Sequence, residues 1–335
     1  MSPRAVVICT HGGPEALRVV PIAIPKPGRG EVVVAVRTAG VAFADVYGRL
    51  GIYPGSPPVP FSPGFDVVGV IDAVGEGGDD GAIGQRVGCI IERGGYSTHV
   101  VCPADRIVPI PDELSDEVAV ALLLNYVTAY QMLHHMLGLK RGDTVFAHAL
   151  AGGVGTAVLD LAGPLGLSVT GTASSAKHAL VRQLGGDPID YRREDFVGAA
   201  LRRHPQGYDG VLDGIGGAHI CRSNQLRAKT GRIVGYGFQS ATTSTWGRLA
   251  VAPTLLRTAL LAIRSCGRAE FYAIMRFNQR SGRRLRDDIS EILAWARNGD
   301  LTPLVSDVLP LEDAAEAHRR LEAGEVRGKL VLRVH

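Results

Sequence analysis

Cysteine is scarce in this 335-residue chain, and its cysteines are widely separated. No two of them form a C-x-x-C pair, which argues against a disulfide framework and against a zinc site built on thiolate pairs. A reducing, cytoplasmic location is therefore the expectation. The five positions are Cys9, Cys89, Cys102, Cys221 and Cys266.

Long hydrophobic runs are also lacking. The N-terminal apolar run is too short for a signal peptide, and no stretch is long enough to span a bilayer, so we expect no stable membrane association. The longest apolar candidate in the C-terminal half, residues 249–263, is interrupted by Pro253 and Arg257. We predict a buried or interface helix there.

A strong excess of charge of one sign is missing as well. The formal net charge is +3, which does not by itself indicate nucleic acid or a membrane surface as a partner. What the chain does have is length and apolar content. Its 335 residues suggest two domains, and a hydrophobic fraction of 46% is ample for two globular cores.

Residues up to about 120 have the composition and the alternating pattern of a β-domain. They are rich in glycine, proline and valine, and alternating runs such as 31–37, 66–74 and 95–102 predict short strands in a barrel-like arrangement. From Ser115 the pattern becomes helical. Ser115 can cap a helix through Leu124, and a second helix is expected from Thr128 to Leu137, closed by Gly138.

Strand and helix patterns then alternate, which predicts a parallel sheet with helices on both faces. Expected strands cover 144–149, 167–172, 188–190, 210–213 and 232–236, and expected helices cover 177–184, 194–203 and 219–228. After residue 237 a Ser/Thr-rich stretch, 239–245, leads into an Arg-rich helical segment. The last expected elements are helices at 289–297 and 309–321 and a strand at 328–334.

A glycine-rich turn follows the strand expected at 144–149. It reads Gly152-Gly153-Val154-Gly155 and opens a helix, which places bare backbone amides and a partial positive charge where an anionic diphosphate can approach. Leu150 stands where the full G-x-G-x-x-G fingerprint has its first glycine; we interpret it as packing under the diphosphate. A tight turn that binds nothing is the alternative, and the surrounding alternation favours the nucleotide.

Several blocks of sequence resemble one known family. They are residues 40–54, 63–75, 125–130, 171–175 and 328–332, together with the glycine-rich turn. They resemble the zinc-independent quinone-oxidoreductase branch of the medium-chain dehydrogenase/reductase superfamily, and they occur in the same order as in that family over essentially the whole chain. Block 125–130 is particularly similar to the vesicle amine transport protein homologues.

The resemblance implies a two-domain architecture. A GroES-like β-barrel domain would comprise residues 1–122 and be completed by residues 278–335. An α/β Rossmann domain with a doubly wound parallel sheet, residues 123–277, would be inserted between them, and the nicotinamide would lie in a cleft. The resemblance also implies a homodimer formed through the Rossmann sheets.

The zinc-ligand positions of metal-dependent relatives carry Ala42, Phe65 and Leu124 here, and none of these can ligate zinc. A structural-zinc lobe is missing too, because residues 86–111 contain only Cys89 and Cys102. No metal is therefore expected. Asp66 replaces the glutamate often seen after the lost histidine ligand, and we expect it to be structural, paired with a cation such as Arg86.

The expected coenzyme is NADPH. An NAD site needs an acidic residue about 20 positions past the glycine-rich turn, and no Asp or Glu occurs between Leu161 and Gly186. Hydroxyls and cations attract a 2′-phosphate, which a carboxylate would repel. By resemblance, Ser174, Lys177 and Tyr191 occupy the positions that bind this phosphate, with Arg182 and Arg192 as helpers. Alternatively, Lys177 is only a solvated helix residue.

The same resemblance assigns further coenzyme contacts to Asn125, Thr128, Thr172 and Tyr236, in addition to Gly152, Gly153, Val154 and Gly155. Thr128 would contact the nicotinamide carboxamide.

Without a metal to polarise a carbonyl, conjugated acceptors are the easier substrates, because hydride addition to a quinone or enone needs only hydrogen bonds and a proton. Tyr47 and Tyr53, in the block that lines the family's substrate cleft, and Thr128 are the catalytic candidates. Tyr47 is a candidate proton donor, although solvent can also supply the proton, and either tyrosine can equally be an ordinary wall residue. Family members typically have Asn at the position of Ala42.

The sequence thus predicts an NADPH-dependent reductase of quinones or α,β-unsaturated carbonyls. The rival is an NADPH-binding interaction protein with little or no turnover, which the vesicle-protein resemblance and the missing Asn allow. Single-stranded RNA binding, shown by some relatives, is disfavoured by the absence of a strong basic excess; no nucleic-acid partner is expected.

Overall fold

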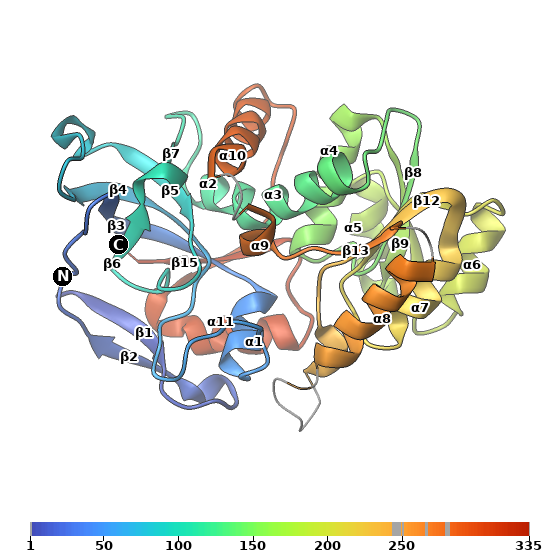
Figure 1. The fold of residues 1–335 in the computed structure, drawn as a ribbon, viewed down its shortest axis with the longest axis horizontal. Helices are drawn as coiled ribbons and strands as arrows, with labels where there is room; N and C mark the ends of the chain where they lie inside the picture. The colour runs from blue at the N-terminus through green and yellow to red at the C-terminus, as the bar shows by residue number, and fades with distance from the viewer. Residues whose placement is uncertain (1, 243–248, 250, 265–266, 279–281, 335) are drawn as a thin grey trace. The chain divides into compact units, whose positions relative to one another are not determined.

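The computed structural model describes residues 2–242, 249, 251–264, 267–278 and 282–334, and the chain forms two compact units (Figure 1). One unit combines Met1–Val127 with Asn278–His335, and the other is Thr128–Phe277. Cys266 and residues 243–245 of the Ser/Thr-rich stretch lie outside the described residues.

The first unit is built on a seven-stranded sheet in the order β14-β15-β3-β4-β5-β7, with β6 also paired to β3. The C-terminal strand β15 enters this sheet antiparallel to β3, so the end of the chain completes the N-terminal domain. A separate hairpin, β1–β2, is antiparallel. The strands are β1 Arg4–Ile8, β2 Leu17–Pro21, β3 Glu31–Val41, β4 Asp66–Val74, β5 Arg86–Ile90, β6 His99–Pro103, β7 Val108–Pro109, β14 Val305–Pro310 and β15 Lys329–Arg333.

The alternating pattern of the sequence becomes the core of this unit. Alternate residues of β3, including Val32, Val34 and Val36, pack with β4, β5, β6 and β15 in one buried apolar cluster. The helices of the unit are α1 Phe43–Arg49, α2 Asp116–Leu122, α10 Gly282–Arg297 and α11 Ala314–Glu322, and α3 Leu124–Tyr130 crosses into the second unit. As expected, the Ser115 side chain caps α2 by accepting the backbone N–H of Val118.

The second unit has a six-stranded sheet in the order β10-β9-β8-β11-β12-β13, and every neighbouring pair is parallel. The order reverses between β8 and β11, as in a doubly wound Rossmann sheet. The strands are β8 Thr144–Ala147, β9 Ser168–Ala173, β10 Asp187–Asp190, β11 Tyr208–Asp213, β12 Arg227–Gly235 and β13 Ala269–Phe271. The predicted fold class is confirmed.

The central strands are apolar along their length because helices cover both faces of the sheet. Val145, Phe146, Val211 and Leu212 are completely buried. The helices of this unit are α4 Gly153–Leu165, α5 His178–Gln183, α6 Phe196–Arg203, α7 His219–Ser223, α8 Ala252–Arg264 and α9 Ile274–Asn278, preceded by a π-helical turn, Gln131–Met136.

Three local expectations are wrong. The edge strand β13 lies where only helix was expected, because three residues are too few to carry a period-2 signal. The helix expected at 219–228 ends early, and Arg227 already begins β12. Residues 309 and 310 belong to β14 rather than to the following helix.

The apolar run at 249–263 does form a helix, but that helix is not buried. Leu256, Leu260 and Ile263 of α8 are 62%, 45% and 77% exposed, whereas Thr254 and Thr258 face the protein. The expectation of a buried helix is therefore wrong, and the alternative, a helix in an interface, stays a prediction. Among the described residues, no helix combines the length and the apolarity needed to cross a bilayer.

The expected partner of Asp66 is also wrong. Its Oδ2 lies 2.7 Å from Nζ of Lys329, whereas Arg86 pairs with Asp116. The reason is topological, because β15 and β4 both pair with β3. Leu330 is in register with Val41 and Val67 with Ala39, so Lys329 and Asp66, which precede them, lie at the same end of β3. Linear sequence gives little indication of this pairing.

Candidate functional site

The glycine-rich turn begins at the carboxyl end of β8. Ala149, at its start, has φ 56°, and it is the one described residue other than glycine with a positive φ. Gly152 caps α4 in an extended conformation, and the first helical acceptor, Gly152 O, takes the N–H of Thr156. The amides of Gly153, Val154 and Gly155 thus lie at the start of the helix, where an anion can accept hydrogen bonds from them.

Gly155 is the position at which the helix meets the strand end most closely. A Cβ on this residue would lie 2.3 Å from Ala149 O and 2.6 Å from Leu150 Cα. Leu150 itself is completely buried and packs against Gly171, as its interpretation as a packing residue requires. The turn therefore has the close helix–strand packing that the third glycine of the G-x-G-x-x-G fingerprint allows, although its first glycine is missing.

The residues expected at the 2′-phosphate follow two paired strands. Ile189 and Asp190 of β10 are in register with Thr172 and Ala173 of β9, so Ser174 and Tyr191 leave the sheet at the same edge. Tyr191 is 51% exposed, and the Arg192 guanidinium lies 5.7 Å from the centre of its ring.

Lys177 follows Ser174 in one short helical turn, in which its N–H donates to Ser174 O. The carboxylate nearest to these positions in sequence, that of Asp190, is buried and accepts the N–H of Arg192. The side chains of Ser174, Lys177 and Tyr191 thus offer two hydroxyls and a cation at this edge.

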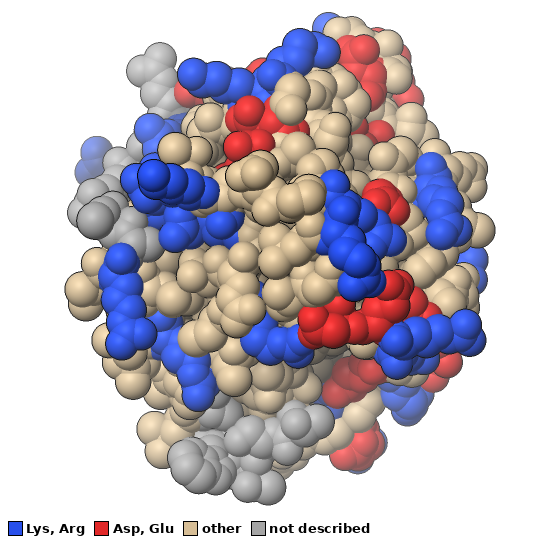
Figure 2. Space-filling model, turned by 90° about the vertical axis from the view of Figure 1, so that its right-hand side faces the viewer, with Lys and Arg blue, Asp and Glu red and all other residues tan. Residues whose placement is uncertain are grey.

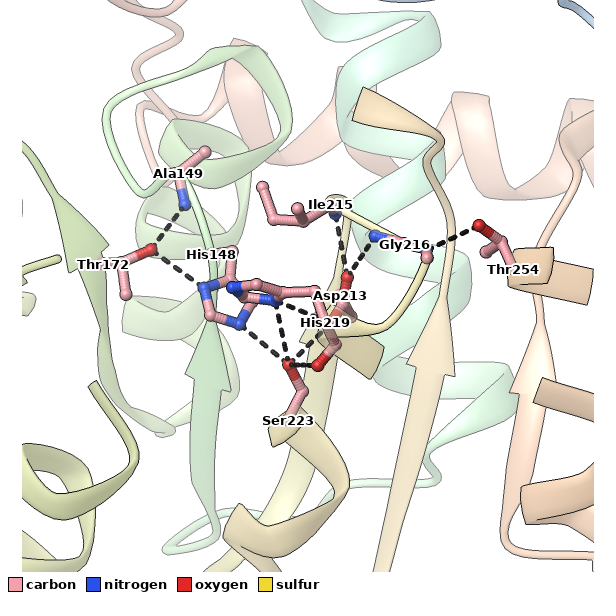
Figure 3. A network of polar contacts seen from close by, with 10 residues as sticks. His148, Ala149, Thr172, Asp213, Ile215, Gly216, His219, Ser223 and Thr254 are labelled. Carbon is pink, nitrogen blue, oxygen red and sulfur yellow. Dashed lines mark hydrogen bonds and ion pairs between the residues drawn. The ribbon is translucent and has the colours of Figure 1, made fainter. Parts of the chain in front are cut away.

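A buried polar network joins the ends of β8, β9 and β11 (Figure 3). His148 Nδ1 lies 3.0 Å from Thr172 Oγ1, and His148 Nε2 lies 3.0 Å from Ser223 Oγ. Ser223 donates to Asp213 Oδ2 at 2.6 Å, and His219 Nδ1 lies 3.3 Å from the same oxygen. The network therefore spans β8 and β11, the two strands between which the sheet order reverses.

The network also holds two turns. Thr172 Oγ1 accepts the N–H of Ala149 at 3.2 Å. Asp213 Oδ1 accepts the N–H groups of Ile215 and Gly216, each at 2.8 Å. The turns after β8 and β11 are thus fixed by one connected set of hydrogen bonds.

The protonation states of this network follow from its burial. Burial lowers the pKa of His148 to about 3, so its ring is neutral at ordinary pH. Burial raises the pKa of Asp213, but the hydrogen bonds that its carboxylate accepts, first among them the one from His219, outweigh that effect, and the pKa falls to about 2. A neutral imidazole and a charged carboxylate result.

Three of these side chains are of types that ligate transition metals. Donor atoms of His148, Asp213 and His219 all lie within 4.8 Å of one another. The Ser223 hydroxyl lies among them, 3.0 Å from His148 Nε2, 2.6 Å from Asp213 Oδ2 and 3.5 Å from His219 Nδ1. The three side chains that could ligate a metal are therefore already engaged in polar contacts with this hydroxyl.

Among the other coenzyme candidates, Tyr236 directly follows β12, and its phenol lies over the turn after β11. A Cβ on Gly214 would meet Tyr236 Oη at 2.9 Å. Asn125 and Thr128 are 7% and 8% exposed and are three positions apart on α3, which places them on one side of that helix. Thr172 is buried, and its hydroxyl is engaged by His148 and Ala149.

The two tyrosines expected at the substrate lie together in the first unit. Tyr47 is on α1 and is 7% exposed. The backbone N–H groups of Ile52 and Tyr53 both donate to Tyr47 O, which ties the second tyrosine to the first. Tyr53 packs edge-on against Phe65, with ring centres 5.3 Å apart, and burial raises its pKa to about 12. Tyr53 therefore holds its proton firmly.

Asp45 organises the start of α1. It is 1% exposed, and it accepts the N–H groups of Ala42 and Gly64 and the hydroxyl of Tyr96. Burial raises the pKa of Asp45 to about 7, against the opposing effect of the two backbone bonds. The segment that starts at Ala42 is thus fixed by a carboxylate that sequence reasoning did not single out.

His148, Asp213, His219 and Ser223 were missed from the sequence as well. His148 lies in the strand expected at 144–149, and Asp213 ends the strand expected at 210–213, so both stood at carboxyl ends of predicted parallel strands. That placement was a usable signal, because ligands of open α/β sheets bind at these ends. His219 and Ser223 are four apart on α7 and gave no comparable signal.

On the face shown in Figure 2, basic side chains are scattered, and several lie beside acidic ones. The ion pairs of the second unit include Arg203 with Asp187, Arg202 with Glu194 and Arg232 with Glu270. Such pairing limits the attraction of the second unit for a polyanion.

Comparison with known proteins identifies the family. Residues 28–112 match the alcohol dehydrogenase GroES-like domain, and residues 184–332 match the family described as zinc-binding dehydrogenase. The synaptic vesicle membrane protein VAT-1 homolog of Rattus norvegicus is 32% identical over 98% of this chain and 83% of that protein. The quinone oxidoreductase of Mus musculus is 28% identical over 98% of this chain and 97% of that protein.

A solved structure agrees with these relatives. The Escherichia coli quinone oxidoreductase complexed with NADPH superimposes with a TM-score of 0.88 and 26% identity, covering 99% of this chain and 100% of that one. The chain belongs to the medium-chain dehydrogenase/reductase superfamily, with quinone oxidoreductases and VAT-1 homologues among its relatives.

Proposed function

We propose that this protein is an NADPH-dependent, metal-free reductase that delivers hydride to a quinone or an α,β-unsaturated carbonyl. The observation that carries the proposal is the edge of the Rossmann sheet after β9 and β10, which presents Ser174, Lys177 and Tyr191. An NAD site has a carboxylate at the end of the second strand. Hydroxyls and a cation there favour a 2′-phosphate.

The turn after β8 suits the diphosphate of such a coenzyme. The close approach of Gly155 to Ala149 and Leu150 leaves no room for a side chain, and the amides of Gly153 and Val154 lie at the N-terminus of the 13-residue helix α4. When bound, NADPH supplies the hydride. The protein's tasks are to hold the coenzyme, to orient the acceptor and to stabilise the negative charge that forms on the acceptor's oxygen.

Metal-free chemistry is supported by the residues at the zinc-ligand positions. Ala42, Phe65 and Leu124 present only hydrocarbon. A conjugated acceptor suits this chemistry, because its reduced oxygen needs only hydrogen bonds and a proton. Tyr47 is the proposed proton donor. Tyr53 is proposed to orient the acceptor through its hydroxyl, since a pKa of about 12 makes it a poor acid.

A second candidate function is NADPH binding without turnover, in service of a protein partner. Ala42 favours it, because the side-chain amide that family members typically offer at this position is missing. The similarity to VAT-1 homologues also favours it.

One experiment separates the two functions. The purified protein is mixed with NADPH and a panel of ortho-quinones and enones, and the loss of NADPH absorbance is followed. Turnover with any member of the panel supports the reductase. Tight NADPH binding without oxidation across the panel supports the binding protein, and weak or absent NADPH binding contradicts both.

We also propose a homodimer formed by the second unit and a reducing, cytoplasmic location. The dimer is supported by the exposed apolar face of α8, formed by Leu256, Leu260 and Ile263, together with β13, the last strand in the sheet order, against which α8 packs. The location is supported by the free thiols of the described cysteines.

A further inference from the structure

The hydrogen bonds of the polar network between β8 and β11, where the order of the Rossmann sheet reverses, all run in one direction from donor to acceptor. Ser223 has one hydroxyl proton and four possible acceptors in reach: Asp213 Oδ2 at 2.6 Å, His148 Nε2 at 3.0 Å, His219 O at 3.2 Å and His219 Nδ1 at 3.5 Å. The shortest contact is with a charged oxygen, so the proton goes to Asp213. Ser223 must then accept from His148, which places the ring proton of His148 on Nε2.

The other ring nitrogen completes the direction. With its proton on Nε2, His148 accepts at Nδ1, so Thr172 donates its hydroxyl proton to it. Thr172 Oγ1 in turn accepts the N–H of Ala149. Every donor in the series points toward the charge of Asp213, and we call the series Asp213–Ser223–His148–Thr172–Ala149 the wire.

The wire ends on a backbone conformation that an alanine rarely adopts. Ala149 has φ 56°, in the left-handed region, where its Cβ is crowded. Its carbonyl accepts the N–H of Gly152 at 2.9 Å, and the same oxygen is the group that a side chain on Gly155 would strike. The conformation of Ala149 therefore sets the shape of the turn that receives the diphosphate.

We infer that Ser223 and His148 are positioning residues for the coenzyme, which act by holding Ala149 in its left-handed conformation. This inference rests on the proposed NADPH binding. Without the wire, the turn populates other conformations, and the apparent affinity for the coenzyme falls by the fraction of molecules that keep the competent turn. Neither residue needs to touch the coenzyme for this effect.

The decisive test uses glycine, which adopts a positive φ without support. Ser223→Ala interrupts the wire, and we expect it to raise the dissociation constant for NADPH about tenfold. In the Ala149→Gly background the same substitution should change that constant less than about threefold. General damage to the fold would not be rescued by a glycine at residue 149.

The matched control is Thr170→Val, which removes another buried hydroxyl of β9, one bonded to Tyr208 and outside the wire. It should leave the NADPH dissociation constant within about twofold of the parent. If Ser223→Ala fails to fold, Thr172→Val breaks the last link with an isosteric side chain. An unchanged affinity in the broken wire, or equal loss in both backgrounds, overturns the inference.

A second readout needs no coenzyme. Amide hydrogen exchange across residues 149–156 should accelerate in Ser223→Ala and not in Thr170→Val. If the parent protein does not bind NADPH, the proposed function fails, and the exchange measurement still decides whether the wire holds the turn. Equal exchange in the parent and in Ser223→Ala would overturn the wire independently.

Discussion

Nζ of Lys329 lies 2.7 Å from Oδ2 of Asp66, and the two side chains are 2% and 0% exposed. The Leu124 N–H also reaches Oδ2, whereas Oδ1 is buried without a hydrogen-bond partner among the described residues. Gly40 makes room for the pair, since a Cβ there would lie 2.3 Å from Oδ1. The C-terminal strand is thus locked to the N-terminal domain by a buried charge pair.

Removing one partner of this pair should be strongly destabilising. We expect Lys329→Met to lower the free energy of unfolding by about 3–5 kcal/mol, because it leaves the Asp66 carboxylate buried without a counter-charge. Adding Asp66→Asn should recover part of that loss. Denaturant unfolding measures both.

The control for this prediction is the exposed pair Arg232–Glu270, whose side chains are 41% and 44% exposed. Arg232→Met should cost less than about 1 kcal/mol. A loss for Lys329→Met no larger than for this control would contradict a structural role for the buried pair.

Coenzyme selectivity should depend on the edge of the sheet after β9. Lys177→Ala should reduce the preference for NADPH over NADH by about tenfold, because it removes the cation from the proposed 2′-phosphate position. Ser174→Asp should reverse the preference, since it places a carboxylate at that end of the strand. Titration of both coenzymes by fluorescence measures the ratio.

Lys140 provides the matched lysine for that comparison. It is exposed and precedes β8, at the amino ends of the parallel strands, whereas Lys177 follows the carboxyl end of β9. Lys140→Ala should leave the ratio of affinities unchanged. An unchanged ratio in Lys177→Ala would instead identify Lys177 as a solvated helix residue.

Buried His318 should make the first unit sensitive to acid. Burial lowers the pKa of His318 to about 3 from its ordinary 6.5, with a smaller contribution from the charge of Arg49, whose Nε donates to the ring at 3.2 Å. Its stabilising contribution is present above about pH 6.5 and is lost as the pH falls, because only the unfolded state then binds a proton.

The expected loss is roughly 1.4 kcal/mol per pH unit below about pH 6.5. His318→Gln should remove this slope, since its amide oxygen can still accept the bond from Arg49 without titrating. Unfolding curves at several pH values measure the difference. Parallel pH dependences of the two proteins would contradict this account.

The elements that could be predicted from the sequence are those with strong periodicity. The strands at the centre of the Rossmann sheet could be predicted from continuous apolar runs, and the glycine-rich turn from its cluster of glycines. The proposed coenzyme edge after β9 rests on a missing acidic residue, which is visible in a linear chain. Ser174 and Lys177 could therefore be named from local sequence together with family resemblance.

The missed features depend on contacts between distant segments. Lys329 meets Asp66 across 263 positions, and His148 meets Ser223 across 75. Neither pairing has a local pattern, since each depends on which strand lies beside which. Likewise β13 is defined by its neighbour β12 rather than by its own three residues.

The apolar face of α8 should control association. Introducing a charge by Leu260→Asp should convert the proposed dimer to a monomer, because it buries an unpaired carboxylate in the interface. Val19→Asp is the matched control, since Val19 is 44% exposed and Leu260 is 45% exposed. Light scattering after size-exclusion chromatography gives the mass of each. A monomeric parent protein, or a dimeric Leu260→Asp, would contradict the proposed interface.

Two glycines of α4 should respond in opposite directions to the same substitution. In Gly155→Ala the new methyl group would lie 2.3 Å from Ala149 O and 2.6 Å from Leu150 Cα, and backbone atoms cannot move aside as a flexible side chain can. At Gly163 nothing lies within 4 Å of an added Cβ. Alanine there should stabilise the helix by about 0.5–1 kcal/mol, because it reduces the freedom of the unfolded chain.

Gly155→Ala should therefore lower the melting temperature and weaken NADPH binding, whereas Gly163→Ala should raise the melting temperature and leave binding unchanged. The pair separates two reasons for a glycine in one helix. At Gly155 the strand end requires the absence of a side chain, while at Gly163 the helix merely tolerates it. If Gly155→Ala binds NADPH as the parent does, the close contact between α4 and the end of β8 is not what shapes the diphosphate turn.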